Sequence, residues 1–545
     1  MTEWLLRGIL GGGLRMIDGA VNAAPTLLVG LLIAVVLRYY FGSDGIRRVF
    51  GGDGLRSLPQ SWLVGMLLPV CSIGVLPILV EMRRARVRAG SMSAFALSAP
   101  LFNPLSLLYG LTLSRPSVVL MFAGGSLIVV TAVGWLWDQY RGQQELGELG
   151  EPSPAVIGIP RLAAMSLYVS RQLAGPVGLW SLVGLSGLFL LAMVLPFASM
   201  QSAVERDDWV APLKMMGVAL PAYATPMMAM SQLGMMFQHA NSPGAAFVLL
   251  TLGTGVNVAT VLWLGRTFGG RSVAIWFAAT VGIVVAIAYA INRPLVPPGV
   301  DPAGHTHAFD IYTNPFNSLG QVSWGTVLES VWGDLGLGEH LSLAALGLLL
   351  LSGLGARIAG WDESRLLAKF AHGKTAKFAG GKTAEVPEGA EAAELPSDEG
   401  PPASGRLRDP VVPPQLVGAT LLVGLVAASV AMSYAYYPDA EECLEEIRLA
   451  RVETLSAARS GRKDHALYWL EVWEDWSRRL EVGTFLRHGE VRPYQRMQGY
   501  LVRKKLELLE HELEHEPYER EEVLRVVESL EATNRRWVNA FRDRE

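Results

Sequence analysis

Ten stretches of about twenty mostly apolar residues recur along this chain, and each is nearly free of ionised side chains in its interior. A helix needs roughly 20 mostly apolar residues to cross the hydrocarbon core of a bilayer. The sequence therefore predicts an all-α, polytopic membrane protein with about ten transmembrane helices. The stretches are residues 21–41, 59–80, 91–113, 116–137, 177–199, 214–237, 243–265, 272–291, 340–358 and 414–435.

Charged side chains are distributed unevenly along the chain. They make up 18% of the 545 residues, against 51% apolar residues, and they are dense only beyond about residue 436. This composition excludes a disordered chain and does not suit an ordinary soluble enzyme. The formal net charge of −4 gives no support to nucleic-acid binding. The two cysteines, Cys71 and Cys443, are too few for a disulfide framework.

These patterns divide the chain into successive regions. Residues 368–375 (AKFAHGKT) are followed directly by AKFAGGKT, a low-complexity composition that cannot bury a core. We expect an N-terminal interfacial segment (1–20), a first repeat (21–137), a connecting loop (138–176), a second repeat (177–291), an extramembrane loop (292–339), a transmembrane helix (340–358), a linker (359–413), a transmembrane helix (414–435) and a soluble helical tail (436–545).

The tail carries an apolar stripe. Trp469, Trp473, Trp476 and Leu480 recur at steps of three or four residues, which places them on one face of a helix. The tail is therefore predicted to be helical. It is either a solvated appendage or the docking site of a protein partner.

Two consecutive stretches are interrupted by proline and glycine. The second contains Pro69, Gly74 and Pro77, and the third contains Pro100 and Pro104. Proline has no N–H group and clashes with the carbonyl four residues earlier. Unpaired backbone groups are costly in lipid, so broken helices are tolerated where they face protein or a cavity. Close helix packing is the alternative role of such small residues.

The same interruptions recur about 150 residues later. Leu-Pro-Ala-Tyr at 220–223 aligns with Leu-Pro-Val-Cys at 68–71, and Asn257 follows Asn103 by 154 residues. We interpret this as a duplication of four helices. An even number of crossings predicts two parallel four-helix repeats. The helix-interrupting residues are Pro69, Gly74, Pro77, Pro100, Pro104, Pro221, Pro226, Gly253 and Gly255.

Paired interrupted helices are the best sequence indication of a transporter's binding site. Around them the stretches contain hydroxyl, amide and thiol groups but no ionisable residue away from their ends. This suits a neutral or softly polarisable solute, or a small ion held by helix ends. The candidate substrate-binding residues are Cys71, Ser72, Ser98, Asn103, Thr225, Thr254 and Asn257.

Three clusters of basic residues leave the membrane orientation open. They lie at residues 38–56, 83–88 and 357–408, and basic loops are usually cytoplasmic. Ten full crossings cannot place all three on one side. Either one apolar segment is re-entrant, or one basic cluster is an exception. The 292–339 loop, with few basic residues, is expected to be extracytoplasmic.

Two histidine patterns suggest metal binding, but neither is assigned a metal. His511-Glu-Leu-Glu-His515 has the spacing of a zinc-protease motif, yet it lies in a highly charged stretch without a third ligand or a pocket. His305 and His307 lie with Asp310 in a Gly/Pro-rich loop. A solvated helix face and loop hydrogen bonding are the interpretations we adopt. No cofactor is expected.

The interrupted segments resemble a known family. The runs PVCSIGVLP, MRRARVRAG and SMSAFALSAPLFNP, with NSPGAAFVLLTLGTGVNVATVLWLG in the second half, are similar to the predicted permeases that include organoarsenical-efflux permeases of the ArsP/YraQ type. The resemblance covers roughly residues 20–291 and implies a plasma-membrane permease built from two repeats. Arsenical-handling members show a Cys-Ser-Cys run, whereas Ile73 occupies the second cysteine position here. We carry over the transport role and not the substrate.

The expected function is a multi-pass permease, not an enzyme, that moves a small molecule or ion across the plasma membrane through a site between the repeats. One transport activity that fits this expectation is the efflux of a soft or metalloid compound. The alternative is a membrane-anchored scaffold or sensor that acts through its helical tail. The expected partners are the lipid bilayer and a small solute, with no nucleic acid.

Overall fold

A computed structural model gives the structure of this protein. It describes residues 2–52, 54–103, 106–107, 110, 116–141, 159–197, 199–200, 208–238, 241–292, 308–316, 335–363, 365–366, 414–514 and 518–542. Within these residues every regular element is a helix. The all-α prediction is therefore confirmed.

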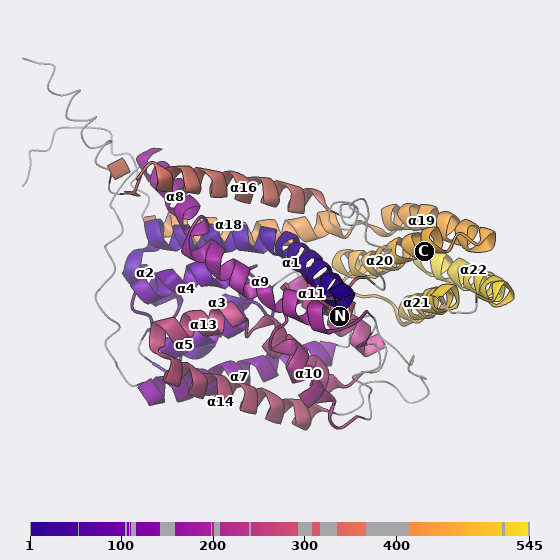
Figure 1. The fold of residues 1–545 in the computed structure, drawn as a ribbon, viewed down its shortest axis with the longest axis horizontal. Helices are drawn as coiled ribbons and strands as arrows, with labels where there is room; N and C mark the ends of the chain where they lie inside the picture. The colour runs from indigo at the N-terminus through magenta and orange to yellow at the C-terminus, as the bar shows by residue number, and fades with distance from the viewer. Residues whose placement is uncertain are drawn as a thin grey trace, which may run out of the picture.

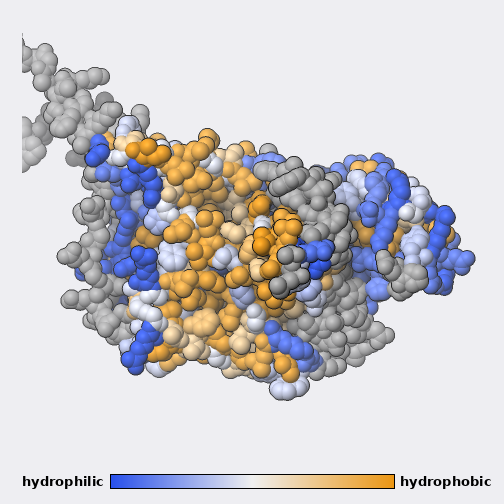
Figure 2. Space-filling view, in the orientation of Figure 1, coloured by the Kyte–Doolittle hydropathy of each residue, from blue (hydrophilic) through white to orange (hydrophobic). Residues whose placement is uncertain are grey.

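The chain forms an apolar body and a separate helical tail domain (Figure 1). A broad hydrophobic band covers the body, and hydrophilic surfaces lie at both ends of that band (Figure 2). The body helices are α1 (Thr2–Val36), the π-helix η1 (Leu37–Phe41), α2 (Gly42–Val49), α3 (Ser57–Leu67), α4 (Val75–Arg84), α5 (Ala89–Ser98), α7 (Pro116–Arg141), α8 (Ile159–Leu173), α9 (Pro176–Val194), α10 (Ala211–Ala219), α11 (Pro226–Gln238), α12 (Pro243–Val248), the π-helix η2 (Leu249–Thr254), α13 (Val258–Phe268), α14 (Gly270–Ile291), the 3₁₀ turn η3 (Asp310–Tyr312), α16 (Leu337–Ile358) and α18 (Pro414–Tyr436).

Five continuous helices in the described residues are long and apolar enough to cross a membrane. They are Glu3–Val49, Val118–Tyr140, Pro160–Val194, Gly270–Ile291 and Gly338–Ile358, and the pair Pro243–Thr254 and Val258–Phe268 forms a sixth, bent by 56°. A shorter apolar helix covers Gln415–Ala428 within α18. The multi-pass expectation is confirmed, but the expected count of ten spans is not. The stretches at 59–80 and 214–237 are not single spanning helices, 414–435 holds only the shorter apolar helix, and part of 91–113 lies outside the described residues.

The stretch at 59–80 turns back on itself. It comprises α3, a turn at residues 68–74 and α4, which we call the first hairpin. Gln60, in α3, donates from Nε2 to the Arg48 carbonyl at 2.7 Å. Arg47 donates from Nε to the carbonyl of Ala85, which directly follows α4, at 2.8 Å. Both ends of the first hairpin therefore lie at one end of the body, beside α2. We call it the basic end.

The stretch at 214–237 also turns back, but at the opposite end. It comprises α10, a turn at residues 220–225 and α11, which we call the second hairpin. The Tyr289 hydroxyl, near the end of α14, donates to the carbonyl of Trp209 just before α10, at 2.9 Å. Gln232, in α11, donates to the Ala308 carbonyl at 2.8 Å. We call this the tail end, because the tail domain lies here (Figure 1).

The two hairpins therefore enter the body from opposite ends. The expected parallel relation between the two four-helix units is wrong, because it assumed that every apolar stretch crosses the membrane. A hairpin contributes no crossing, so each unit crosses an odd number of times and the second unit is upside down relative to the first. The broken segments α5 and α12–α13 run in opposite directions for the same reason.

Two boundaries also differ from expectation. Residues 1–20 were expected to form a separate interfacial segment, but α1 continues without interruption from Thr2 to Val36. Glycines on α1 allow close contact with α9, since a Cβ at Gly12 would lie 2.7 Å from the Phe189 carbonyl oxygen. The expected loop at 138–176 contains the helix α8 (Ile159–Leu173).

The tail is a four-helix domain with its own hydrophobic core. Its helices are α19 (Ala440–Ser460), α20 (Lys463–His488), α21 (Pro493–Glu514) and α22 (Arg520–Arg542). Asp439 caps α19 by accepting the Glu442 N–H at 3.0 Å, and Gly461, at φ 72°, ends it in a left-handed conformation. Trp473 and Leu480 of the predicted stripe are fully buried in this core, and Trp469 and Trp476 pack against it.

Candidate transport site

The tip of the first hairpin is a compact turn buried within the body. α3 ends one residue before Leu68, and Pro69 cannot continue its hydrogen bonding. The Cys71 carbonyl accepts the Val75 N–H at 2.9 Å, and the Cys71 Sγ accepts the Gly74 N–H at 3.4 Å. These bonds satisfy the first N–H groups of α4, so the chain can reverse within the apolar body.

The tip of the second hairpin is built in the same way from different residues. α10 ends at Ala219, and Pro221 lies in the turn. Thr225 then caps α11, with its Oγ1 accepting the Met228 N–H at 3.3 Å. Pro226 is the first residue of α11, where a missing N–H has no cost. Threonine and proline therefore define where the second arm begins.

The two asparagines cap the second halves of the broken crossing segments. Asn257 Oδ1 accepts the Ala259 N–H at 2.9 Å, and its Nδ2 donates to the Gly184 carbonyl at 3.0 Å. Asn103 Oδ1 accepts the Ser106 N–H at 2.7 Å. Both Oδ1 atoms are thus already engaged by backbone N–H groups, in the manner of a helix N-cap.

Several other candidate residues also bond to nearby backbone. Ser98 donates to the Phe95 carbonyl at 3.4 Å, and Thr254 donates to the Leu250 carbonyl. Among the interrupting residues, Pro77 lies in the first turn of α4, where proline is tolerated and does not break the helix. Gly253 lies inside η2, Gly255 directly follows it and Pro100 lies in the turn after α5. Pro104 lies outside the described residues.

The hairpin tips meet the opposite unit near the middle of the body. Thr260 of α13 donates from Oγ1 to the Ser72 carbonyl at 3.4 Å. A Cβ on Gly184 of α9 would lie 3.2 Å from Ile73. The Tyr223 hydroxyl, at the second tip, lies near the Cys71 thiol and the Thr26 hydroxyl, but neither contact has the geometry of a hydrogen bond. Cys71, Ser72 and Tyr223 therefore come together, although 150 residues separate the two segments.

Two hydroxyl groups at this meeting point have no hydrogen-bond partner among the described residues. They are the Ser72 Oγ and the Tyr223 Oη, and both side chains are at most 1% exposed. A buried hydroxyl without a partner costs about 1–3 kcal/mol. Native structures rarely keep such groups without a role in binding, strain or hydration. Sequence analysis identified Ser72 but missed Tyr223, Thr26 and Thr260.

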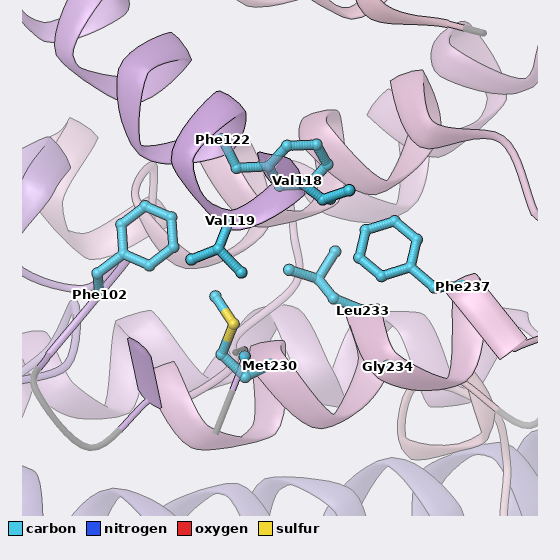
Figure 3. A pocket seen from close by; sticks show the side chains of 9 residues that line it. Phe102, Val118, Val119, Phe122, Met230, Leu233, Gly234 and Phe237 are labelled. Atoms are coloured by element: carbon cyan, nitrogen blue, oxygen red, sulfur yellow. The ribbon is translucent and has the colours of Figure 1, made fainter. Parts of the chain in front are cut away.

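The meeting point is closed in this conformation. A cavity of about 10 Å³, barely enough for one water, lies between α7 and α11. Figure 3 shows Phe122, Leu233 and Phe237 directed into it. A larger cavity of about 320 Å³ lies beside Pro221 and Val258, and its lining is apolar. Neither of these two cavities is lined by Asn103 or Asn257.

No group of three metal-ligating side chains occurs in the described part of the chain. His511 lies on α21, whereas His305, His307 and His515 fall outside the described residues. Neither of the two histidine patterns therefore has a set of metal ligands among the described residues.

Comparisons with known proteins identify a family for the first part of the chain. Residues 16–293 match a family model described as a predicted permease. The UPF0718 protein YcgR of Bacillus subtilis (strain 168) is 23% identical over 278 residues, which cover 49% of this chain and 92% of YcgR. A putative two-component membrane permease complex subunit of Streptococcus mutans serotype c (strain ATCC 700610 / UA159) is 20% identical over 266 residues, 43% of this chain and 87% of that protein. No solved structure matches the chain significantly.

The family match covers about half of the chain and includes both hairpins and both broken segments. Its ends fall near the middle of α1 and just after α14, so α16, α18 and the tail domain are additions to the family body. This chain therefore belongs to the ArsP-type family of predicted permeases, as a multi-pass protein of the plasma membrane.

Proposed function

We propose that this permease carries a small, uncharged solute by alternating access, with the solute bound where the two hairpin tips meet. Two hairpins from opposite ends, each followed by a broken crossing segment, are the arrangement of an inverted-repeat transporter. In such proteins the substrate lies at the repeat interface near the middle of the bilayer. The unpartnered hydroxyls of Ser72 and Tyr223 at that interface are the observation that carries this proposal.

The chemistry of the meeting point favours an uncharged solute that forms hydrogen bonds. The described residues there supply hydroxyl groups, one thiol and backbone carbonyls, with no ionised side chain beside them. A bare charge moved into such a site would lose its hydration without a counter-charge. Cys71 adds a soft, polarisable atom, although its Sγ already accepts the Gly74 N–H.

We propose that the basic end faces the cytoplasm. Because the first hairpin adds no crossing, the arginines at 38–56, those at 83–88 and Arg357 all lie at one end of the body. The described tail-end surface of the body has fewer cations, including Arg7, Arg15 and Lys214. With the basic end in the cytoplasm, the described arginines of all three basic clusters agree with the positive-inside rule. In this proposed orientation the tail domain is extracytoplasmic.

The test is solute flux in liposomes that contain the purified full chain. A panel of neutral metalloid hydroxides, polyols and amides is offered, and Ser72→Ala and Tyr223→Phe are compared with wild type. Both variants are expected to lose most of the flux of any transported solute. Thr131→Ala removes a hydroxyl that bonds only within α7, so it should transport normally. Full flux in both tip variants would place the binding site elsewhere.

A further inference from the structure

A buried cluster of charged groups joins the first hairpin to its surroundings at the basic end. At its centre is Glu81 of α4, which is 2% exposed. Arg84 Nη1 lies 2.7 Å from its Oε1, and Arg38 Nη1 lies 3.8 Å from its Oε2. The Tyr168 hydroxyl of α8 also donates to Oε1. Side chains from η1 and α8, together with Arg84 of α4 itself, thus contact one carboxylate on the second arm of the hairpin.

A second carboxylate reaches this cluster from beyond the family body. Glu363, which follows α16, accepts from Arg38 Nη2 at 3.2 Å and from the Tyr39 hydroxyl at 2.5 Å. Arg38 is therefore shared between Glu81 and Glu363, and its guanidinium also lies 4.7 Å from the centre of the Tyr168 ring. The four charged groups balance, which is what a buried network requires.

The cluster lies where a contact between α4 and the end of α1 can keep the basic end of the body closed. Arg38 and Tyr39 lie in η1, a π-helix at the end of α1, and such local irregularities often occur at functional sites. α4 connects Glu81 directly to the tip that carries Cys71 and Ser72. Separating α4 from α1 at the basic end requires that the Glu81–Arg38 contact be broken. Paired charges can separate and re-form between two discrete states, as switching interfaces do.

We propose that Arg38, Glu81 and Glu363 form a charged contact, which we call the latch, that holds the cytoplasmic side of the permease closed. Glu363, from the segment that follows α16, supplies the second carboxylate of this contact. The latch rests on the proposed alternating-access function. Opening of the latch would let water from the basic end reach the hairpin tip. Glu363 therefore connects the segment after α16 to the stability of the closed state.

Cys71 provides a native reporter for this motion, because it is fully buried at the tip in the closed conformation. Cys443→Ala in the full chain leaves Cys71 as the single thiol. A membrane-impermeant maleimide is applied to inside-out vesicles, and the rate of Cys71 modification is measured. Glu363→Gln removes one charged hydrogen-bond acceptor and is expected to raise the rate about tenfold. Asp44→Asn, on the exposed face of α2 at the same end, should leave it unchanged.

Glu81→Gln is expected to raise the rate at least as much, and Glu81→Gln/Glu363→Gln should give less than the product of the two single effects, because both carboxylates act through Arg38. Thermal unfolding of each variant in detergent checks that it is folded. If Glu81→Gln does not fold, Glu363→Gln alone decides, since Glu363 is partly exposed and outside the family body. An unchanged rate in Glu363→Gln overturns the latch.

Flux measurements separate the latch from the transport function. If wild type transports a solute but the Cys71 rate does not respond to Glu363→Gln, the latch is wrong and the permease proposal stands. If the rate rises as expected and no solute in the panel moves, the latch is supported and the proposed solute class fails.

Discussion

Gly30 of α1 lies against the tip of the first hairpin so closely that a Cβ atom at position 30 would overlap the Gly74 carbonyl oxygen. The second unit repeats this relationship, because a Cβ at Gly187 of α9 would overlap the Pro221 carbonyl oxygen. Each hairpin tip is therefore seated against a glycine in the first helix of its own unit.

Gly30→Ala should displace the first tip and destabilise the protein by about 1–3 kcal/mol, the usual cost of overpacking. Gly124→Ala in α7 is the matched control, since a Cβ there meets open space. The control should be neutral or stabilising by up to about 1 kcal/mol, because alanine favours helix. Thermal unfolding in detergent measures both. Equal losses would show that the tip contact does not constrain Gly30.

Asn257 and Ser72 should respond differently to replacement by alanine. Asn257→Ala removes the cap of α13 and the bond to Gly184, and we expect a loss of about 2 kcal/mol in stability. Ser72→Ala removes a buried hydroxyl without a partner, so its stability should be equal or higher while flux falls. Asn22→Ala, on an exposed part of α1, is the control. A stable, transport-dead Asn257→Ala would assign Asn257 to the substrate instead.

The proposed topology predicts which surfaces an impermeant thiol reagent reaches in intact cells. In the Cys443→Ala background, Tyr494→Cys places a thiol on an exposed part of the tail domain, and Asp44→Cys places one at the basic end. The first should be modified from outside, and the second only after the membrane is opened. The reverse pattern would invert the orientation of the whole protein.

Alkaline pH should weaken the tail domain through Cys443. Its side chain is fully buried, and burial raises the pKa of the thiol to about 12. The unfolded chain loses this proton near pH 8.5. The contribution to stability is therefore complete below about pH 8.5 and is lost as the pH rises toward 12. Unfolding of wild type should depend more steeply on pH in this range than unfolding of Cys443→Ala, as followed by tryptophan fluorescence. Parallel curves would contradict the assignment.

The positions of the breaks could be predicted from the sequence because their cause is local. Pro69, Pro100 and Pro221 each lie in a turn between two helices, as expected from a residue without an N–H group. The direction of the chain after each break was not predictable in this way. Proline ends a helix equally well whether the next helix continues forward or reverses, and only tertiary contacts such as Arg47 to Ala85 decide between them.

The candidate site was predicted in part for the same reason. Thr225 and Asn257 lie at the breaks as expected, but their polar groups cap α11 and α13. A single sequence shows that a polar residue is present, and not whether its hydrogen bonds are already used by backbone. Tyr223 was missed as a candidate because its proposed role depends on its position beside Cys71, which lies about 150 residues earlier.

The opposed hairpins have a consequence for the unseen state of this permease. The two units share one sequence of helices but lie in opposite orientations in the membrane. Any difference in conformation between the two units can therefore be exchanged between them. The outward-facing conformation would then resemble the inward-facing one viewed upside down. The protein would reach it when each unit adopts the local conformation that the other unit has now.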